Sequence, residues 1–280
     1  MRKAKFFVCF LLTIGSAVQS DGAPASGKYF DRAIFVVFEN TDYSKAIKQP
    51  FFRTLADQGA HFANFSAPTH PSQGNYVALT SGDTNGVKDD RKVDLDVENI
   101  ADLLETKGLT WKVYAEDYPG GCFTGKTSLG YARKHNPFIS YVNIQNNPKR
   151  CANIVSAKEF DSDAARGALP NYVFYVPNLD SDGHDTGVVF ADTWYKEKFT
   201  PYLNDTHFMA NTILISTFDE SAGGFKNQIY TSVVGPAVRP TVVAESLNSY
   251  SLLALIEENW SLGNLGKKDV SAVRIHDIWR

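Results

Sequence analysis

The sequence predicts an α/β fold in which helices cover both faces of a doubly wound, mostly parallel central sheet. Short runs of β-branched and aromatic residues alternate along the chain with longer segments of helical periodicity, and this alternation is typical of parallel βαβ units. The 280 residues, of which 43% are apolar, supply enough side chains for one large core. No internal repeat or low-complexity linker divides the chain.

The first predicted strand, Ala33–Phe38, is a continuous apolar run, as expected of a strand that is buried on both faces. Two predicted helices follow: Phe51–Gly59 stops at a glycine, and Val97–Lys107 carries apolar side chains at helical spacing before Gly108. The remaining predicted strands are Trp111–Tyr114, Tyr172–Val176, Thr212–Thr217 and Ile229–Val234. The remaining predicted helices are Phe190–Tyr202 and Ser249–Trp260.

Residues 1–20 have the pattern of a secretory signal peptide. Three basic residues precede an apolar run, Phe6–Gly15, and Val18 and Ser20 form a small-residue cleavage pattern. An N-terminal anchor or a buried strand is the alternative interpretation. The run is about ten residues, shorter than the ~20 that span a bilayer, so we expect no stable membrane insertion. We expect a protein that is secreted to the medium, cell wall or vacuole, with residues 21–280 as a single domain.

The charge of the chain excludes some classes of partner. The 28 basic and 31 acidic residues give a net charge of −3, and no long run carries one sign. Nothing therefore indicates nucleic acid as a binding partner or a polybasic membrane-binding surface. An anionic substrate would have to be attracted by local groups or by bound cations. The oligomeric state does not follow from the sequence.

Cysteines and sequons fit an oxidising compartment. Cys122 and Cys151 are the only cysteines beyond the signal peptide and could close a single loop, although two free buried thiols are the alternative. Three Asn-x-Ser/Thr sequons predict glycosylation at Asn64, Asn204 and Asn259.

Polar side chains follow three of the predicted strands at the edge where ligands collect in an open α/β sheet. Glu39 and Asn40 follow the first strand, and Asp219 and Glu220 follow the fourth. The segment Asn178–Asp185, after the third, adds further acids and a histidine. Because gathered carboxylates repel each other unless a cation lies between them, the pattern predicts a divalent metal site of unknown identity. Ordinary loop carboxylates that cap helices or form turns are the alternative.

The segment Ala67–Gly82 contains a serine just ahead of a short helix-like run. A hydroxyl at this position faces unpaired backbone N–H groups and the positive end of the helix dipole, which is a natural phosphate site. A serine there is usually only an N-cap. Combined with the acidic strand ends, Ser72 becomes a candidate nucleophile whose alkoxide a metal would stabilise.

Six short motifs occur in order along most of the chain. They are Phe38-Glu39-Asn40, His70–Tyr76, Tyr114-Ala115-Glu116, Lys134–Phe138, Pro177-Asn178 with Asp182–Asp185, and Thr217–Glu220. Together they resemble the phosphoesterase family, which holds secreted bacterial phospholipases C and bacterial and fungal acid phosphatases. The resemblance runs from about Tyr29 to Trp260 and implies an alkaline-phosphatase-like fold.

The resemblance also implies roles for the residues that match the family's motifs. The implied catalytic residues are Ser72 as nucleophile, Asn75 as a contact to the phosphoryl group, and His184 near the leaving group. The implied metal ligands are Glu39, Asn40, Asp182, Asp219 and Glu220. The implied substrate contacts are His70, Lys134 and His135. For His70 a structural role is the alternative, and for Lys134 and His135 a place in a surface turn.

These observations predict a secreted, metal-dependent hydrolase of phosphoric esters. We expect an acid phosphatase that acts on phosphomonoesters through a phosphoseryl intermediate. A phospholipase C-type phosphodiesterase is the alternative, but the sequence shows no separate lipid-binding domain. A second alternative is a secreted binding protein with weakened catalysis, because Ser249 stands where relatives commonly have a histidine. The physiological ester does not follow from the sequence.

Overall fold

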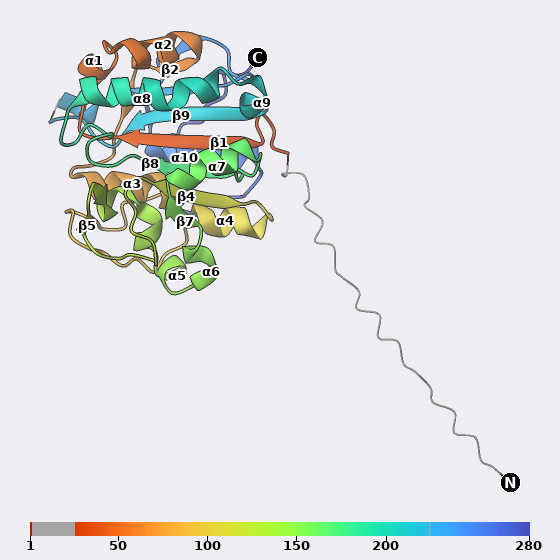
Figure 1. Cartoon of the computed structure of the whole chain (residues 1–280). Coiled ribbons are helices and arrows are strands. Elements are labelled where there is room, and N and C mark those ends of the chain that lie inside the picture. Colours follow the sequence, from red (N-terminus) through yellow and green to blue (C-terminus); the bar gives the residue numbers. More distant parts are fainter. Residues whose placement is uncertain (2–25, 224) are drawn as a thin grey trace.

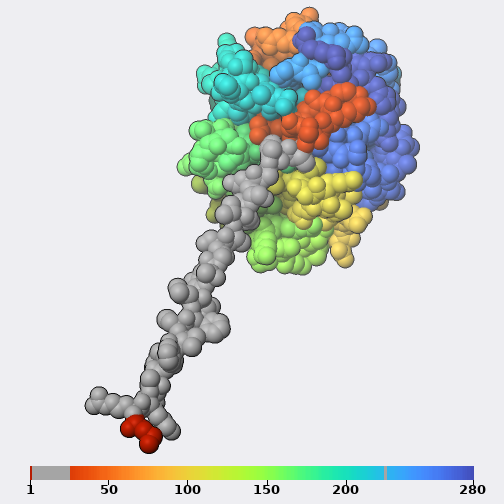
Figure 2. Space-filling view, turned by 90° about the vertical axis from the view of Figure 1, so that its right-hand side faces the viewer, coloured from red at the N-terminus to blue at the C-terminus, as the bar shows by residue number. Residues whose placement is uncertain are grey.

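The computed structural model describes Met1 and residues 26–223 and 225–280. The predicted signal peptide, residues 1–20, lies outside the described residues except for Met1, so its cleavage and the domain boundary at residue 21 stay predictions. The chain enters the fold at the start of β1 (Arg32–Phe38), on the side that Figure 2 shows. Tyr29 stacks there on Trp279, with ring centroids 4.2 Å apart. This contact ties the beginning of the described fold to its end.

An eight-stranded sheet forms the centre of the molecule (Figure 1), in the order β11-β2-β10-β9-β1-β8-β4-β7. Besides β1, its strands are β2 (Ala60–Phe62), β4 (Trp111–Ala115), β7 (Ile154–Ser156), β8 (Tyr172–Val176), β9 (Thr212–Phe218), β10 (Thr231–Val234) and β11 (Thr241–Val243). β1 pairs in parallel with both β8 and β9, and β4 pairs in parallel with β7 and β8. Only β10 runs against its neighbours. The predicted mostly parallel sheet is therefore confirmed.

Helices cover both faces of the sheet. The α-helices are α1 (Tyr43–Ala46), α2 (Pro50–Gln58), α3 (Ser72–Ser81), α4 (Ile100–Thr106), α5 (Val142–Gln145), α6 (Pro148–Cys151), α7 (Lys158–Ala165), α8 (Val188–Leu203), α9 (Thr206–Met209) and α10 (Ser249–Asn259). Three short 3₁₀ helices are η1 (Arg133–His135), η2 (Pro137–Ser140) and η3 (Phe225–Asn227). In Figure 1, α8 lies in front of the central strands and α10 behind them.

Two short ribbons lie beside the main sheet. One pairs β3 (Phe65–Ser66) with β12 (Leu247–Asn248), and the other is the hairpin of β5 (Thr127–Ser128) and β6 (Tyr131–Ala132). The first ribbon joins the approach to α3 to the start of α10, and the second lies in the long connection between β4 and β7.

Aromatic side chains of the strands pack into the core on both faces of the sheet. Phe38 packs edge-on against Phe52 of α2 and Tyr195 of α8, at 4.9 and 4.8 Å between ring centroids. Phe35, three residues earlier on the opposite face, packs against Tyr172 at 5.3 Å. Because β1 buries side chains on both faces, its sequence shows a continuous apolar run instead of an alternation.

Local chemistry explains where several helices begin. α2 has proline at its first position, and the buried Asp192 carboxylate of α8 accepts hydrogen bonds from the backbone N–H groups of Phe51 and Phe52. α4 begins at a capping box of Asn99 and Asp102, so it starts three residues later than the predicted Val97–Lys107. A carboxylate at a helix N-terminus satisfies otherwise unpaired N–H groups.

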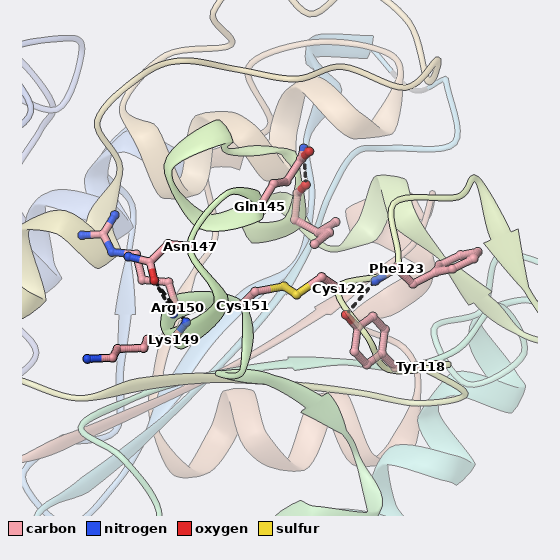
Figure 3. Close-up of a disulfide and its surroundings, with 9 residues drawn as sticks. Tyr118, Cys122, Phe123, Gln145, Asn147, Lys149, Arg150 and Cys151 are labelled. Carbon is pink, nitrogen blue, oxygen red and sulfur yellow. Dashed lines mark hydrogen bonds between the residues drawn. A yellow bond between two sulfur atoms is a disulfide. The ribbon is translucent and has the colours of Figure 1, made fainter.

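A disulfide joins Cys122 and Cys151, whose Cα atoms are 5.7 Å apart (Figure 3). The pairing decides between the two alternatives that the sequence left open. The closed loop contains the β5–β6 hairpin, η1 and η2. Next to Cys122, the backbone N–H of Phe123 donates to the hydroxyl of Tyr118 at 3.2 Å.

The three sequons differ in accessibility. Asn64 and Asn204 are exposed. Asn259 is buried, its Nδ2 donates to the carbonyl of Phe30 at 2.9 Å, and its Oδ1 accepts from the N–H of Tyr29. A glycan on Nδ2 would break this contact, so the prediction of glycosylation at Asn259 is wrong for the folded chain. Within the described part of the chain, no helix combines the length and apolar character needed to cross a membrane.

The C-terminal segment places two carboxyl groups together beneath α10. Glu257 is buried on α10, and Asp269 is fully buried and accepts from the N–H groups of Leu265 and Lys267 at 2.7 and 2.8 Å. Burial, together with the negative charge of Asp269, raises the pKa of Glu257 to about 8. The folded state therefore holds this proton more tightly than the unfolded chain does.

This proton makes stability depend on pH. The contribution of Glu257 is fully present below its ordinary pKa of 4.5 and is lost as pH rises toward about 8. We predict that Glu257→Gln, which removes the titration, stabilises the protein at pH 8 relative to wild type by more than it does at pH 5. Urea unfolding at the two pH values measures this difference. The exposed Glu245→Gln is the control, and an equal effect of Glu257→Gln at both pH values contradicts the assignment.

Candidate active site

The carboxyl ends of β1, β8 and β9 meet at one edge of the sheet, at the arrowheads of β1 and β9 in Figure 1. Backbone hydrogen bonds fix the loops that follow them. The N–H of Glu39 donates to the carbonyl of Asp182 at 3.0 Å, and the N–H of Asn40 donates to Oδ1 of Asp219 at 3.1 Å. Glu220 follows directly. The predicted convergence of the acidic strand ends is therefore what the structure shows.

Ser72 is the first residue of α3 and is buried. Its Oγ lies 3.0 Å from Oε2 of Glu39 and 3.3 Å from Oε1 of Glu220. The N-cap position belongs to Pro71, and no side chain caps the helix. The hydroxyl thus points at carboxylates from two strands, and the alternative that Ser72 is an ordinary N-cap is wrong.

The side-chain amide of Asn75 is held by the backbone of Thr69. Its Oδ1 accepts from the N–H of Thr69 and its Nδ2 donates to the carbonyl of the same residue, both at 2.9 Å. Asn227 donates to that carbonyl from the other side at 2.7 Å. Asn75 therefore braces the turn before Ser72, and its expected contact to the phosphoryl group, for which one Nδ2 hydrogen remains, stays a prediction.

His135 is expected from the sequence to contact substrate, with a place in a surface turn as the alternative. The ring is buried between two carboxylates, so the surface-turn alternative is wrong and the substrate contact stays a prediction. Its Nε2 is 3.0 Å from Oε1 of Glu39, and its Nδ1 is 3.0 Å from Oδ2 of Asp182. Tyr76 donates its hydroxyl to the same Glu39 oxygen at 2.8 Å and stacks on the imidazole at 5.3 Å.

Sequence reasoning did not single out Tyr76, although a signal was present. Tyr76 stands four residues after Ser72 in the same helix, and residues at this spacing lie on one helix face. A serine and a phenol at i and i+4 therefore reach the same carboxylate, Glu39.

The charges of the cluster are strongly coupled. Burial alone would raise the pKa of Glu39, but His135 and then Lys134 outweigh burial and lower the pKa to about 2. Burial likewise opposes the charged form of His135, yet Glu39 and Asp182 raise its pKa to about 10. The cluster therefore contains an ionised Glu39 and an imidazolium at neutral pH.

The pKa shifts of the other carboxyl groups indicate that negative charge exceeds positive charge in the cluster. Burial, and then the charges of Glu39 and Glu220, raise the pKa of Asp219 well above its usual range. Burial also raises the pKa of Asp182 and of Glu220, although His135 and His70 respectively oppose the shift. Such shifts arise where carboxylates outnumber the cations near them.

Three predicted side chains lie at the rim of the cluster. His70 is exposed and holds Oε2 of Glu220 with its Nδ1 at 2.5 Å. His184 pairs with Asp185 through Nδ1 at 2.6 Å, and its Nε2 lies 3.4 Å from Nζ of Lys134. The ammonium group of Lys134 thus lies beside the surface histidine, and its charge also acts on the buried Glu39.

The donor set fits a hard divalent cation. The oxygens of Glu39, Asn40, Asp219 and Glu220 are of the type such ions prefer, and the buried Oδ2 of Asp219 has no hydrogen-bond partner in the described part of the chain. Among the described residues, no three His, Cys, Asp or Glu side chains form a ready-made cage for a metal ion. These residues therefore fit a divalent cation through the type of their donor atoms and their excess of negative charge.

Ser249 begins α10 directly after the capping Asn248. No hydrogen bond or ion pair between described residues joins it to the acidic cluster. The weakened-site alternative, which depends on a histidine being absent at this position, therefore stays a prediction.

Known proteins show a consistent pattern of similarity. A model of the Phosphoesterase family matches residues 35–263. A "Probable acid phosphatase" of Kluyveromyces lactis is 38% identical over 260 residues, which cover 88% of this chain and 62% of that protein. A "Phosphatidylinositol-3-phosphatase" of Mycobacterium tuberculosis is 32% identical over 271 residues, covering 95% and 88%. The chain spans 58 to 63% of the length of four fungal acid phosphatases that it matches.

Solved structures support the fold. A protein of the alkaline phosphatase superfamily from Vibrio parahaemolyticus superposes with a TM-score of 0.61 over 90% of this chain and 72% of its own, at 13% identity. The resemblance drawn from the six motifs and the alkaline-phosphatase-like fold are therefore confirmed.

The buried position of His135 yields a test of stability. We predict that His135→Gln, measured in EDTA at neutral pH, lowers the free energy of unfolding by about 3–5 kcal/mol, because it leaves Glu39 and Asp182 without their buried cation. Urea denaturation measures the loss. The exposed His207→Gln should change stability by less than about 0.5 kcal/mol, and equal small effects of both substitutions would refute the bridging role.

Proposed function

Because the chain belongs to the phosphoesterase family, we propose that it is a metal-dependent hydrolase of phosphoric esters, acting as an acid phosphatase on phosphomonoesters. One observation carries the proposal: the buried Ser72 hydroxyl lies within hydrogen-bond distance of both Glu39 and Glu220. The fungal acid phosphatases at 32 to 38% identity support this class of reaction.

Glu39, Asn40, Asp219 and Glu220 would hold the divalent cation. The alkaline phosphatase superfamily is generally metal-dependent, and an excess of buried carboxylates is what a cation would neutralise. When bound, such an ion acts as a Lewis acid that favours the serine alkoxide and polarises a phosphoryl oxygen.

Ser72 is the proposed nucleophile. Its proton passes to Glu220, the contacted carboxylate whose pKa burial raises, and Oγ attacks phosphorus in line with the departing alcohol. Lys134 supplies positive charge to the phosphoryl oxygens. Water then cleaves the phosphoseryl bond, which releases inorganic phosphate and restores Ser72.

His184 is the proposed proton donor to the leaving alcohol. Asp185 orients the ring through Nδ1, which leaves Nε2 on the side of Lys134. A carboxylate on one imidazole nitrogen and the reacting group near the other is a recurrent arrangement for general acid–base catalysis. His135 has no such freedom, because both of its nitrogens contact carboxylates.

We further propose export from the cell with removal of residues 1–20 and glycan attachment at Asn64 and Asn204. The disulfide is typical of oxidising compartments. A lipid-borne phosphomonoester is the second candidate substrate, because the mycobacterial relative, whose name specifies such a lipid, matches this chain over most of both lengths.

The nucleophile assignment is tested by one substitution. We predict that Ser72→Ala lowers turnover of p-nitrophenyl phosphate by at least about 1000-fold, because no other group supplies the attacking oxygen. Its melting temperature should stay close to that of wild type, since the hydroxyl caps no helix. Retained activity in a folded Ser72→Ala protein would eliminate Ser72 as the nucleophile.

The metal assignment is tested without relying on turnover. Titration of the EDTA-treated protein with Mg²⁺, Mn²⁺ or Zn²⁺ should raise the melting temperature with at least one ion, because a cation that binds only the folded state stabilises it. Asp219→Asn should abolish most of that rise, whereas the exposed Asp277→Asn should leave it intact. A melting temperature insensitive to all three ions would argue against a metal in this cluster.

A further inference from the structure

A cavity of about 260 Å³ opens beside the acidic cluster. Its lining residues are Gln73, Asp90, Lys92, Lys126, Thr127, Ala132, Arg133, Lys134, Leu179 and His184. The volume is close to the lower end of ligand pockets, about 300 Å³. The cavity thus has room for a small group only.

The cavity adjoins the side on which the alcohol of the ester would leave. Gln73 directly follows the nucleophile Ser72, and His184, the proposed proton donor to that alcohol, is part of the wall. Lys134 connects the two regions, because it lines the cavity and its charge helps to lower the pKa of Glu39. The portion of a substrate beyond the scissile bond would therefore extend into this space.

The lining is strongly cationic. It carries four basic side chains and a single acid, Asp90, which lies 3.3 Å from Nζ of Lys134. Arg133 is buried, and its Nη2 donates to the carbonyl of Val93 and to Asp94. Two exposed lysines remain for a ligand. Lys92 has only a 3.7 Å contact to Asp94, and the ion pairs between described residues include none to Lys126.

The wall that carries Lys92 is held in place by the helix of the nucleophile. The side chain of Gln73 donates to the carbonyls of Asp89 and Arg91 at 3.0 and 2.8 Å, and its backbone N–H donates to Asp90 at 3.0 Å. The opposite wall, with Lys126, belongs to the loop closed by the disulfide. The segment of Lys92 is therefore tied to the helix of Ser72 by hydrogen bonds, and the segment of Lys126 is constrained by the disulfide.

We propose that this cavity is a subsite for a second anionic group, so that the preferred substrates are phosphomonoesters whose alcohol bears another phosphate or a phosphodiester. The inference rests on the proposed function and adds the substrate class to it. Lys92 and Lys126 are the specificity-determining residues, because each can donate charge-assisted hydrogen bonds to phosphate oxygens. A soluble bisphosphate and a phosphorylated lipid headgroup share this chemistry.

The test compares kcat/KM for glucose 1,6-bisphosphate with kcat/KM for glucose 1-phosphate, at low ionic strength. Wild type should prefer the bisphosphate by at least about tenfold, and Lys126→Ala or Lys92→Ala should each reduce that preference about tenfold. Activity on glucose 1-phosphate should not change. Lys126→Arg should retain the preference, and Lys149→Ala, an exposed lysine of α6 outside the cavity, should leave it intact.

A second arm compares kcat/KM for phosphatidylinositol 3-phosphate in phosphatidylcholine vesicles with kcat/KM for glucose 1-phosphate. In either arm, a preference over glucose 1-phosphate that depends on the two lysines supports the subsite. The arm that shows this preference identifies the source of the second anion. Absence of preference in both arms, or an equal loss on glucose 1-phosphate in the lysine variants, overturns the proposal.

A binding measurement on an inactive variant tests the subsite independently of turnover. Isothermal titration of Ser72→Ala with the two glucose phosphates should show tighter binding of the bisphosphate, and the difference should disappear in Ser72→Ala/Lys126→Ala. If wild type hydrolyses no ester, the proposed function fails while this titration still decides whether the subsite exists. Equal affinities for the two ligands refute the subsite even in an active enzyme.

Discussion

Balance of buried charge is the constraint on which this structure depends. Parallel pairing of β1 with β8 and β9 brings the acidic loops after all three strands to one edge. Such an edge is stable only when cations compensate the carboxylates. His135 supplies one buried positive charge between Glu39 and Asp182. The remaining negative charge faces Ser72, which is the place where the proposed chemistry needs an ion and a phosphoryl group.

The same constraint explains how far the sequence could be interpreted. The central strands are predictable because burial on both faces demands continuous apolar runs, as in β1 and β8. Glu39 and Asp219 are predictable because each directly follows such a run. Ser72 is predictable from its place at the start of a helix. These features are local in sequence, and the topology of a parallel sheet brings them together.

Features that depend on distant contacts were not predictable. Asn75 has the right residue type and position for a phosphoryl contact, but its amide is bound to Thr69. The direction of a side chain depends on the loop around it, and no periodicity encodes that. The cationic cavity combines Lys92 and Lys126 from irregular segments with Lys134 of η1, and neither helical nor strand spacing relates one lysine to another.

The disulfide gives the chain a dependence on where it matures. The loop between Cys122 and Cys151 carries Lys126, Lys134 and His135, which include the buried cation of the acidic cluster and two cations of the cavity. On a chain-entropy basis, closing a loop of this length is worth about 3–4 kcal/mol. A reduced chain would hold these three cations less firmly, and its carboxylates would be less well compensated. Assembly of the site is therefore coupled to thiol oxidation, since the same covalent bond that closes the loop also limits how far these cations can move from the carboxylates.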